Sequence, residues 1–179
     1  MLVEIQVFHN VEYETSFDED ETRWDINEAI DKFNDICIPD NVNEILKNYL
    51  DELNTGLLTM RVVSIVDCYL KMGTQSSIYR YMQNEPIFVM VFKIEADDNK
   101  VPNEEELSFV SDELINLVFD NLKTNTVYVT ESSTNIRPNF DLNGYYETSE
   151  NFEDDEGEVS FYLDHRDNIE IKKLKEVDK

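Results

Sequence analysis

Glycine, proline and cysteine are scarce in this chain, which has four Gly, four Pro and two Cys among 179 residues. With so little glycine, the sequence contains neither a GxGxxG nor a GxxxxGK(S/T) phosphate-binding loop. Cys37 and Cys68 are too few for a disulfide scaffold and lack the paired spacing of a zinc site. We therefore expect them to be reduced residues of the core.

Long hydrophobic runs are also absent. No stretch approaches the roughly eighteen consecutive apolar residues that indicate a membrane-spanning helix. The first residues, "MLVEIQVFHNVEYE", have no basic region and alternate apolar with polar side chains, which is typical of a strand and not of a signal peptide. We expect a cytoplasmic protein, located in the host cytoplasm if the gene is viral.

Positive charge is the scarcest property of all. Fifteen Lys and Arg stand against forty Asp and Glu, for a net charge of -25. Such a field repels DNA, RNA and anionic membranes and accelerates encounter with a basic surface. Salt adaptation would favour Ala and Gly, whereas this chain has two Ala and eighteen Asn, a bias typical of A+T-rich genomes such as those of many bacteriophages, bacteria and large viruses.

The charge is divided into blocks along the chain. Residues 1–56 have a net charge of -12 and residues 97–159 of -14, whereas residues 57–96 carry +1 and residues 160–179 carry zero. A chain of this length with 41% hydrophobic residues can bury the core of one domain. We predict a single domain over 1–179, in which the acidic segments 1–56 and 97–159 flank a neutral sheet core at 57–96.

The neutral segment has the composition of β-strands. Residues 57–95 are rich in Val, Ile, Phe and Tyr, and the segment 77–86 suggests a further short strand with a turn at 84–86. Such continuously apolar runs predict strands covered on both faces. Further strands are expected at 126–131, 158–164 and 168–174, with a polar loop at 131–139.

Three helices are predicted from apolar stripes of period 3.6, at 25–36, 41–54 and 103–122, and Pro39 is expected to separate the first two. In the third, Asn103 is expected to cap the helix, with Glu106 reaching back as in a capping box. The fold class is therefore α+β, a mixed or antiparallel sheet covered by about three helices in one compact domain.

No catalytic or metal site is predicted. Asp141 and Asn143 begin like a calcium loop, but Gly144 falls at the fourth position and not the sixth. Neither His9 nor His165 adjoins a Ser or Cys in a recognisable nucleophile motif. We predict no cofactor.

One nuclease-like pattern remains as an alternative. Asp164, Glu170 and Lys172 are spaced like the acid and ExK triplet of the PD-(D/E)xK nucleases. A net charge of -25 is ill suited to gripping DNA, and an edge strand protected by Lys172, Lys173 and Lys175 explains these residues better.

The composition instead resembles that of the phage-encoded DNA mimics that block restriction enzymes, CRISPR effectors or DNA-binding host proteins. This resemblance implies a non-enzymatic inhibitor whose partner is a basic nucleic-acid-binding protein, such as a CRISPR effector or restriction enzyme, with no direct contact to nucleic acid or membrane. A structural or adaptor module of a virion or cytosolic complex is the main alternative. The sequence does not set the oligomeric state.

The predicted partner-binding surface consists of acidic clusters with aromatic anchors beside one of them. The acidic residues are Asp18, Glu19, Asp20, Glu21, Glu104, Glu105, Glu106, Asp112, Glu113, Glu150, Glu153, Asp154, Asp155 and Glu156, and the anchors are Tyr145, Tyr146 and Phe152. Carboxylates in a first helical turn also stabilise the helix, so we expect those of loops to contribute more to binding.

Overall fold

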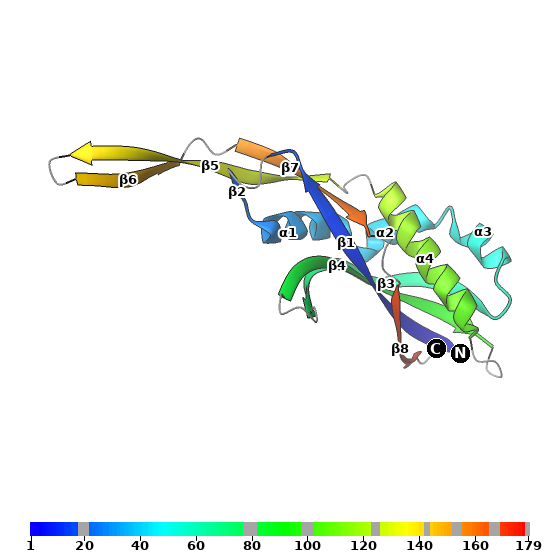
Figure 1. Cartoon of the computed structure of the whole chain (residues 1–179). Coiled ribbons are helices and arrows are strands. Elements are labelled where there is room, and N and C mark those ends of the chain that lie inside the picture. Colours follow the sequence, from blue (N-terminus) through cyan, green and yellow to red (C-terminus); the bar gives the residue numbers. More distant parts are fainter. Residues whose placement is uncertain are drawn as a thin grey trace.

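The computed structural model describes residues 1–17, 22–76, 82–97, 102–122, 126–141, 144–151, 155–164 and 169–177. These residues form four helices and an antiparallel sheet in an α+β arrangement (Figure 1). The helices are α1 (Ile26–Ile36), α2 (Pro39–Leu46), α3 (Leu50–Thr55) and α4 (Glu104–Asn121). The strands are β1 (Leu2–Thr15), β2 (Thr22–Arg23), β3 (Met60–Ser76), β4 (Met82–Ala96), β5 (Thr126–Asp141), β6 (Gly144–Asn151), β7 (Asp155–Leu163) and β8 (Glu170–Val177).

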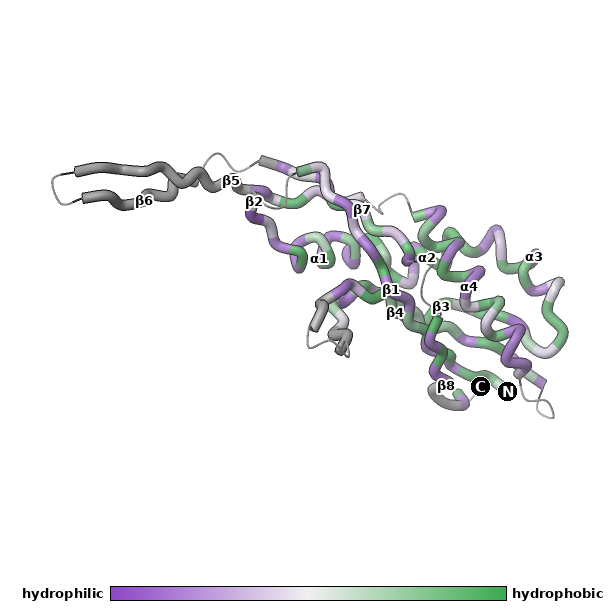
Figure 2. Tube along the Cα trace, viewed as in Figure 1, coloured by the Kyte–Doolittle hydropathy of each residue, from purple (hydrophilic) through white to green (hydrophobic). Residues whose placement is uncertain are grey.

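Strand β1 joins the two parts of the sheet. Its first half pairs with β4 and with β8, and its last five residues, 11–15, pair with β7. The strand order is β2-β5-β7-β1-β4-β3, with β8 beside β1 and β6 beside β5. Burial alternates along β1, because successive side chains of a strand point to opposite faces. Figure 2 shows the same mixture of hydrophilic and hydrophobic residues within single elements.

Four phenylalanine rings form the centre of the core. Phe33 of α1 lies 6.4 Å from Phe88 of β4, 5.8 Å from Phe119 of α4 and 5.7 Å from Phe161 of β7, measured between ring centroids. All four rings are buried, and α1, α4 and β7 come from segments far apart in the sequence. Edge-to-face aromatic pairs add to the free energy gained by burial. The helices and both parts of the sheet therefore share one core.

Three asparagines cover the free edge of β3. Asn34 of α1 accepts a hydrogen bond from the Leu70 amide at 2.7 Å and donates to the Leu70 carbonyl at 2.9 Å. Asn43 of α2 makes the same two bonds to Ile65, and Asn54 of α3 makes them to Val62. A side-chain amide presents one acceptor and one donor, as a neighbouring strand would. Each helix thus satisfies part of an edge that could otherwise pair with another chain.

The edge of β5 is covered by helix α1 in a similar way. Glu28 accepts a hydrogen bond from the Thr130 amide at 3.2 Å, and the Lys32 ammonium donates to the Tyr128 carbonyl. Glu28 and Lys32 also form an ion pair at 3.4 Å, one helical turn apart. Both outer edges are therefore occupied by side chains of this chain along these segments.

The predicted helix over 41–54 is wrong as a single element. The structure divides it into α2 and α3, which are separated by a turn at 47–49. In one continuous helix, Asn43 and Asn54 would be about 16.5 Å apart along the axis, whereas Val62 and Ile65 on the strand are separated by only about 10 Å. The break shortens the path so that both amides reach β3. Pro39 does not separate the helices but begins α2, where its missing N–H costs nothing.

The predicted turn at 84–86 is also wrong. Of the short strand predicted at 77–86, residues 82–86 belong to β4, and residues 77–81 lie outside the described residues. Asn84, Glu85 and Pro86 lie within β4 and pair with Thr74, Gly73 and Met72 of β3. Pro86 is compatible with the strand because β1 pairs with β4 only from residue 87 onward. The predicted sheet at 57–95 is confirmed, as β3 and β4, but β1, β5 and β7 contribute to the same core.

The prediction that these strands are covered on both faces is confirmed for β4 and wrong for β3. Residues 88–92 of β4 are all buried, so side chains on both faces of this strand are covered. In β3, which ends the sheet, Val63 and Val66 are 41% and 37% exposed at two irregularities of the strand register.

Cys37 and Cys68 are confirmed as free core residues, with their sulfur atoms 3.7 Å apart. No helix in the described ranges is long and apolar enough to cross a membrane.

Candidate binding surfaces

The outer face of strands β1, β7 and β5 carries a set of carboxylates and tyrosines, which we call the acidic sheet face. Its residues are Glu12, Glu14, Glu156, Glu158, Tyr128 and Tyr162. They share a face because Tyr162 pairs with Glu12, and Tyr128 pairs with Glu158, in the antiparallel register. The opposite face carries Val159, Phe161 and Leu163, which are buried in the core.

The geometry of this face follows from the sheet. Alternate residues of one strand are about 6.5 Å apart, and directly paired residues about 5 Å apart. Glu14 accepts a hydrogen bond from the Tyr162 hydroxyl across the strands at 3.4 Å. Tyr128 is 52% exposed and Tyr162 is 38% exposed, so both rings are accessible beside the carboxylates. The backbone of this face is fixed by the hydrogen bonds between β1, β7 and β5. The face therefore needs no ordering before it binds a partner.

The tyrosines respond to the negative charge around them. The pKa of Tyr128 is raised, first by its hydrogen bond to Glu158 and then by the charges of Glu158 and Glu156. Burial raises the pKa of Tyr162, and the charges of Glu14 and Glu12 raise it further. Each phenolate is disfavoured beside these carboxylates. The face therefore has a negative potential in which the two tyrosine hydroxyls keep their protons.

Two of the predicted acidic clusters adjoin this face along the chain. Residues 18–21 follow the end of β1, and residues 152–154 precede β7; both lie outside the described residues. The ends of these strands are neighbours, since the Ser16 amide donates to the Glu158 carbonyl at 3.1 Å. In the cluster at 150–156, the side chain of Glu156 is exposed. The last described residues of β1 and the first residues of β7 therefore lie side by side, and the two predicted clusters adjoin them in the sequence.

The remaining predicted residues of this region lie in β6. Tyr145 and Tyr146 pair with Phe140 and Asn139 of β5, and Glu150 pairs with Asn135. The predicted loop at 131–139 is wrong, because this segment continues β5 into a hairpin that extends away from the helices (Figure 1). The side chains of β6 and the residue Phe152 lie outside what the structure describes, so their role as anchors stays a prediction.

The helical cluster lies on α4, separate from the acidic sheet face. Glu104, Glu105 and Asp112 are exposed, and Asn103 caps the helix by accepting hydrogen bonds from the Glu105 and Glu106 amides at 2.8 and 3.2 Å. The cap is confirmed as predicted.

The reciprocal half of the predicted capping box is wrong. The Glu106 carboxylate accepts hydrogen bonds from the Leu58 amide at 2.6 Å, the Thr59 amide at 3.0 Å and the Thr59 hydroxyl. These bonds lower the pKa of Glu106, the Thr59 hydroxyl contributing most. The Asn103 amide instead donates to the Thr59 hydroxyl at 3.3 Å. Glu106 therefore fixes the segment between α3 and β3, and its carboxylate is already occupied within the chain.

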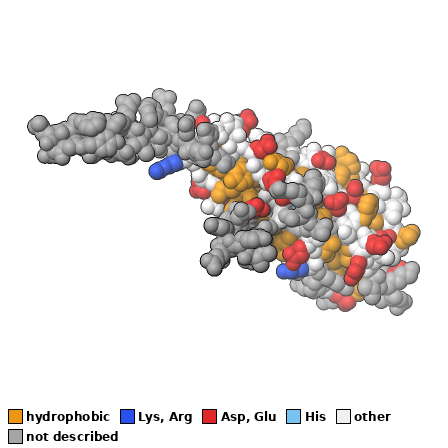
Figure 3. Space-filling view, viewed as in Figure 1, with side chains coloured by type: hydrophobic (Ala, Val, Ile, Leu, Met, Phe, Trp, Pro, Cys, Tyr) orange, Lys and Arg blue, Asp and Glu red, His pale blue; other side chains and the backbone are white. Residues whose placement is uncertain are grey.

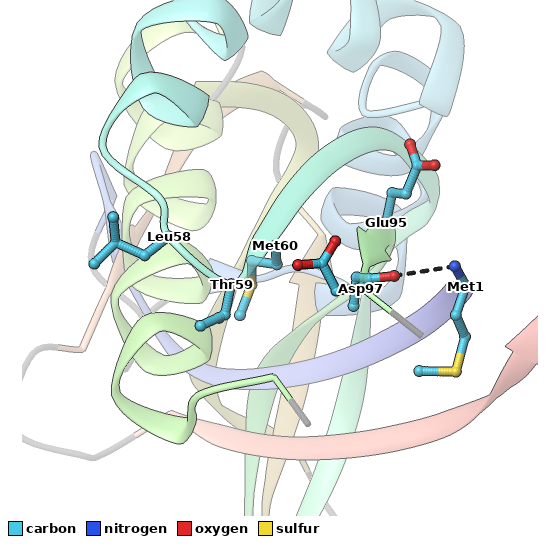
Figure 4. Close-up of a pocket in the computed structure, with 7 residues that line it drawn as sticks. Met1, Leu58, Thr59, Met60, Glu95 and Asp97 are labelled. Atoms are coloured by element: carbon cyan, nitrogen blue, oxygen red, sulfur yellow. Dashed lines mark hydrogen bonds between the residues drawn. The ribbon is translucent and has the colours of Figure 1, made fainter. Parts of the chain in front are cut away.

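A groove of about 310 Å³ lies between α3 and α4. Its walls are apolar, from Leu53, Phe109 and Leu117, and Glu52 and the predicted Glu113 line it as well. A second pocket of about 330 Å³ lies at the other end of α4, between Met1, residues 58–60 and residues 95–97 (Figure 4). There the Met1 amino group donates to the Ala96 carbonyl at 3.0 Å.

The nuclease-like residues have structural contacts. Asp164 is buried at the end of β7, where its amide donates to the Asn10 carbonyl at 3.0 Å. Glu170 and Lys172 lie on β8, which pairs with β1, and the Lys172 ammonium lies 5.1 Å from the centre of the Phe8 ring. Among the residues that the structure describes, no group of three or more His, Cys, Asp or Glu side chains could hold a metal ion.

Sequence reasoning missed Glu12, Glu14 and Glu158, and the exposed rings of Tyr128 and Tyr162. The signal was strict alternation of polar and apolar residues, in "VEYE" of β1 and "GEVSFYLD" of β7, which places every second residue on one face. The register that brings β1, β7 and β5 together is not encoded in either stretch alone.

Acidic side chains greatly outnumber basic ones on the face of the molecule shown in Figure 3, where they alternate with apolar and uncharged side chains. The acidity is therefore spread over that face and not confined to one patch. No protein-family model matches the chain, and no curated protein or solved structure is significantly similar to it. Its function has to be inferred from its own residues.

Proposed function

We propose that this chain is an acidic, non-enzymatic binding protein that occupies the basic groove of a nucleic-acid-binding protein and excludes DNA or RNA from it. The observation that supports the proposal is the acidic sheet face. Four carboxylates and two accessible tyrosines lie on a three-stranded surface, and the tyrosine pKa values rise in the field of those carboxylates.

A basic partner follows from the charge. Forty acids and fifteen bases leave at least twenty-five carboxylates without a cation of their own. A groove that binds phosphates presents Lys and Arg side chains, which an anionic protein surface neutralises in place of the nucleic acid. Carboxylates at regular spacing on a rigid sheet offer such a groove a comparable array of charges. The two tyrosines add apolar area and hydroxyl groups to this surface. Tyrosine is one of the residues enriched at protein interfaces.

The proposed partner is a CRISPR effector, a restriction enzyme or another basic nucleic-acid-binding protein of a host cell. In this proposal the chain is encoded by a phage or virus and acts in the host cytoplasm as an inhibitor. In this proposal the acidic clusters at 18–21 and 150–156 also contribute to binding, and the motive is that they adjoin β1 and β7 in the sequence.

The hairpin of β5 and β6 favours a second candidate function. Its strands pair over residues 134–141 and 144–151 and extend away from the helices (Figure 1). A projecting hairpin is suited to bridge two components of an assembly, which supports a structural or adaptor module. An adaptor can bind its partner without displacing nucleic acid.

A competition assay separates the two functions. The immobilised protein captures its partner from a host lysate, and the protein is then titrated into a pre-formed complex of that partner with labelled DNA or RNA. The proposal predicts displacement of the nucleic acid that weakens as salt is raised, because exposed charges are screened within about 8 Å at physiological ionic strength. A stable ternary complex would contradict inhibition and support the adaptor.

A further inference from the structure

The groove between α3 and α4 is apolar and accessible, with two exposed aromatic side chains in its lining. Phe109 of α4 is 53% exposed, and Tyr49 at the start of α3 is 36% exposed, although both are large aromatic side chains. Exposed apolar side chains that gather around a groove mark an interaction site more often than single ones do.

Phe109 is not required for the core of the protein. The buried stripe of α4 consists of Leu107, Val110, Ser111, Leu114, Ile115, Val118 and Phe119. Phe109 lies outside that stripe and lines the groove together with Leu53 and Leu117. Its ring remains in water in the isolated chain, so covering it with an apolar side chain of a partner is favourable by about 25 cal/mol for each Å² removed from water.

The charge around the groove selects its occupant. Glu52 and Glu113 line it, and neither α3 nor α4 contains a single Lys or Arg. A second copy of the chain would bring another net charge of -25 to this surface, and nucleic acids or anionic lipids would be repelled in the same way. A cationic segment of a partner is instead attracted by Glu52 and Glu113 at the rim, and its apolar side chains can pack against the apolar centre of the groove.

We propose that the α3–α4 groove docks a cationic amphipathic segment of a protein partner. One bulky apolar side chain of that segment enters between Phe109, Leu53 and Leu117, and flanking Lys or Arg side chains pair with Glu52 and Glu113. This site is separate from the acidic sheet face, so the proposal does not depend on displacement of nucleic acid.

Gly56 provides a way to close the groove without strain. It lines the groove with φ at -86°, in a region open to any residue, and an added Cβ would meet only the Leu53 carbonyl oxygen, at 3.7 Å. In Gly56→Leu the larger side chain should therefore fill the site. Phe109→Ala removes the central contact instead, and because Phe109 is half exposed, this change should leave the melting temperature nearly unchanged.

The test uses a fluorescent amphipathic helical peptide made of Leu and Lys, measured by fluorescence anisotropy at physiological ionic strength. A control peptide has the same Lys residues with each Leu replaced by Ser. We expect the Leu/Lys peptide to bind the wild type, and Gly56→Leu and Phe109→Ala to weaken binding about tenfold or more, as loss of a central anchor does at other interfaces. The Ser/Lys peptide should bind much more weakly.

Two charge-matched variants separate the groove from general attraction. Glu113→Lys changes the rim of the groove, and Glu104→Lys makes the same change of net charge at an exposed position outside it. The proposal predicts a large loss of binding for the first and a small loss for the second. Equal losses for the two variants, or equal binding of the two peptides, would overturn it.

Two further outcomes are decisive. Self-association of the chain in sedimentation experiments that Phe109→Ala abolishes would assign the groove to a second copy and overturn the cationic occupant. Neutralising Glu12, Glu14, Glu156 and Glu158 to Gln should leave the effects of the groove variants unchanged. If those effects vanish in that background, the groove is not a separate site.

Discussion

Glu106 shows how much of the acidity is structural at the scale of single residues. Its carboxylate accepts hydrogen bonds from the Leu58 and Thr59 amides, whereas its neighbour Glu105 is exposed in the same first turn of α4. Both carboxylates favour the helix N-terminus by a similar amount. Only Glu106 also holds another segment in place, so the two residues can be compared directly.

Glu106→Gln should lower the free energy of unfolding near neutral pH by about 1 to 2 kcal/mol, because one amide oxygen cannot replace both carboxylate oxygens as acceptors. The pKa of folded Glu106 lies below its ordinary value of 4.5, so the carboxylate adds stability above that value, and this stability is lost as the pH falls through the folded pKa. Chemical denaturation at a series of pH values should therefore show the gap between wild type and variant closing below pH 4.5. A similar loss in Glu105→Gln would show that the helix terminus, and not the Leu58 and Thr59 contacts, is responsible.

Val89 tests the core of the sheet at the same scale. It is fully buried in the middle of β4, where it pairs with Phe8 and Tyr69. Val89→Asp buries an unpaired charge and should cost more than about 4 kcal/mol, enough to unfold the domain. Val63→Asp in β3, at a side chain 41% exposed, should leave a cooperative thermal transition. Equal loss of the thermal transition in both variants, measured by circular dichroism, would contradict the buried position of Val89 and the exposed position of Val63.

At the scale of elements, the helices act on the sheet through the asparagines that cover β3. Each of α1, α2 and α3 supplies one amide that bonds both polar groups of one strand residue. The edge of the sheet is therefore closed by its own helices, and partner recognition by addition of a strand to this part of β3 is not expected.

Asn43→Ala should expose the Ile65 amide and carbonyl, which Asn43 bonds at 2.8 and 2.9 Å. We expect a loss of about 2 kcal/mol in the free energy of unfolding, from two hydrogen bonds of about 1 kcal/mol each. Hydrogen exchange should accelerate at Ile65 more than at Leu70, which Asn34 still covers. Asn48→Ala, at an exposed turn position, is the control. Unchanged exchange at Ile65 would contradict the assigned role of Asn43.

The elements also show what the sequence could and could not predict. Helix α4 was predicted to within a residue, because its apolar stripe and its Asn103 cap are local signals. The segment 131–139 of β5 was predicted as a loop, because the polar run "ESSTNIRPN" has no apolar alternation and most of it forms a strand through its pairing with β6. The division between α2 and α3 likewise depends on distances along β3, which no local pattern contains.

The same limit applies to the candidate site. Sequence clustering singled out the acidic runs at 18–21 and 153–156, which stand out in a linear count. It overlooked Glu12, Glu14 and Glu158, because single acids between apolar residues do not form runs. Only the pairing of β1 with β7, and of β7 with β5, places them on one surface.

At the scale of the whole molecule, the proposed recognition of a partner depends on where the charge lies and not only on its total. General attraction to a basic partner depends on the net charge of -25, whereas a defined interface depends on particular positions. Neutralising equal numbers of carboxylates at two places separates the two contributions. The structure supplies both sets, one on the acidic sheet face and one on the exposed surfaces of the helices.

The most direct test compares these two sets in binding to the captured partner. In the first variant Glu12, Glu14, Glu156 and Glu158 become Gln; in the second, the exposed Asp31, Asp35, Glu44 and Asp120 become Asn or Gln. Both variants lose four negative charges, so stopped-flow association rates across a salt series compare position alone. The account predicts a slower association rate, a weaker salt dependence and a loss of nucleic-acid displacement in the first variant, and values close to wild type in the second. Equal slowing in both variants would show that net charge alone attracts the partner, and would contradict the acidic sheet face as the binding surface.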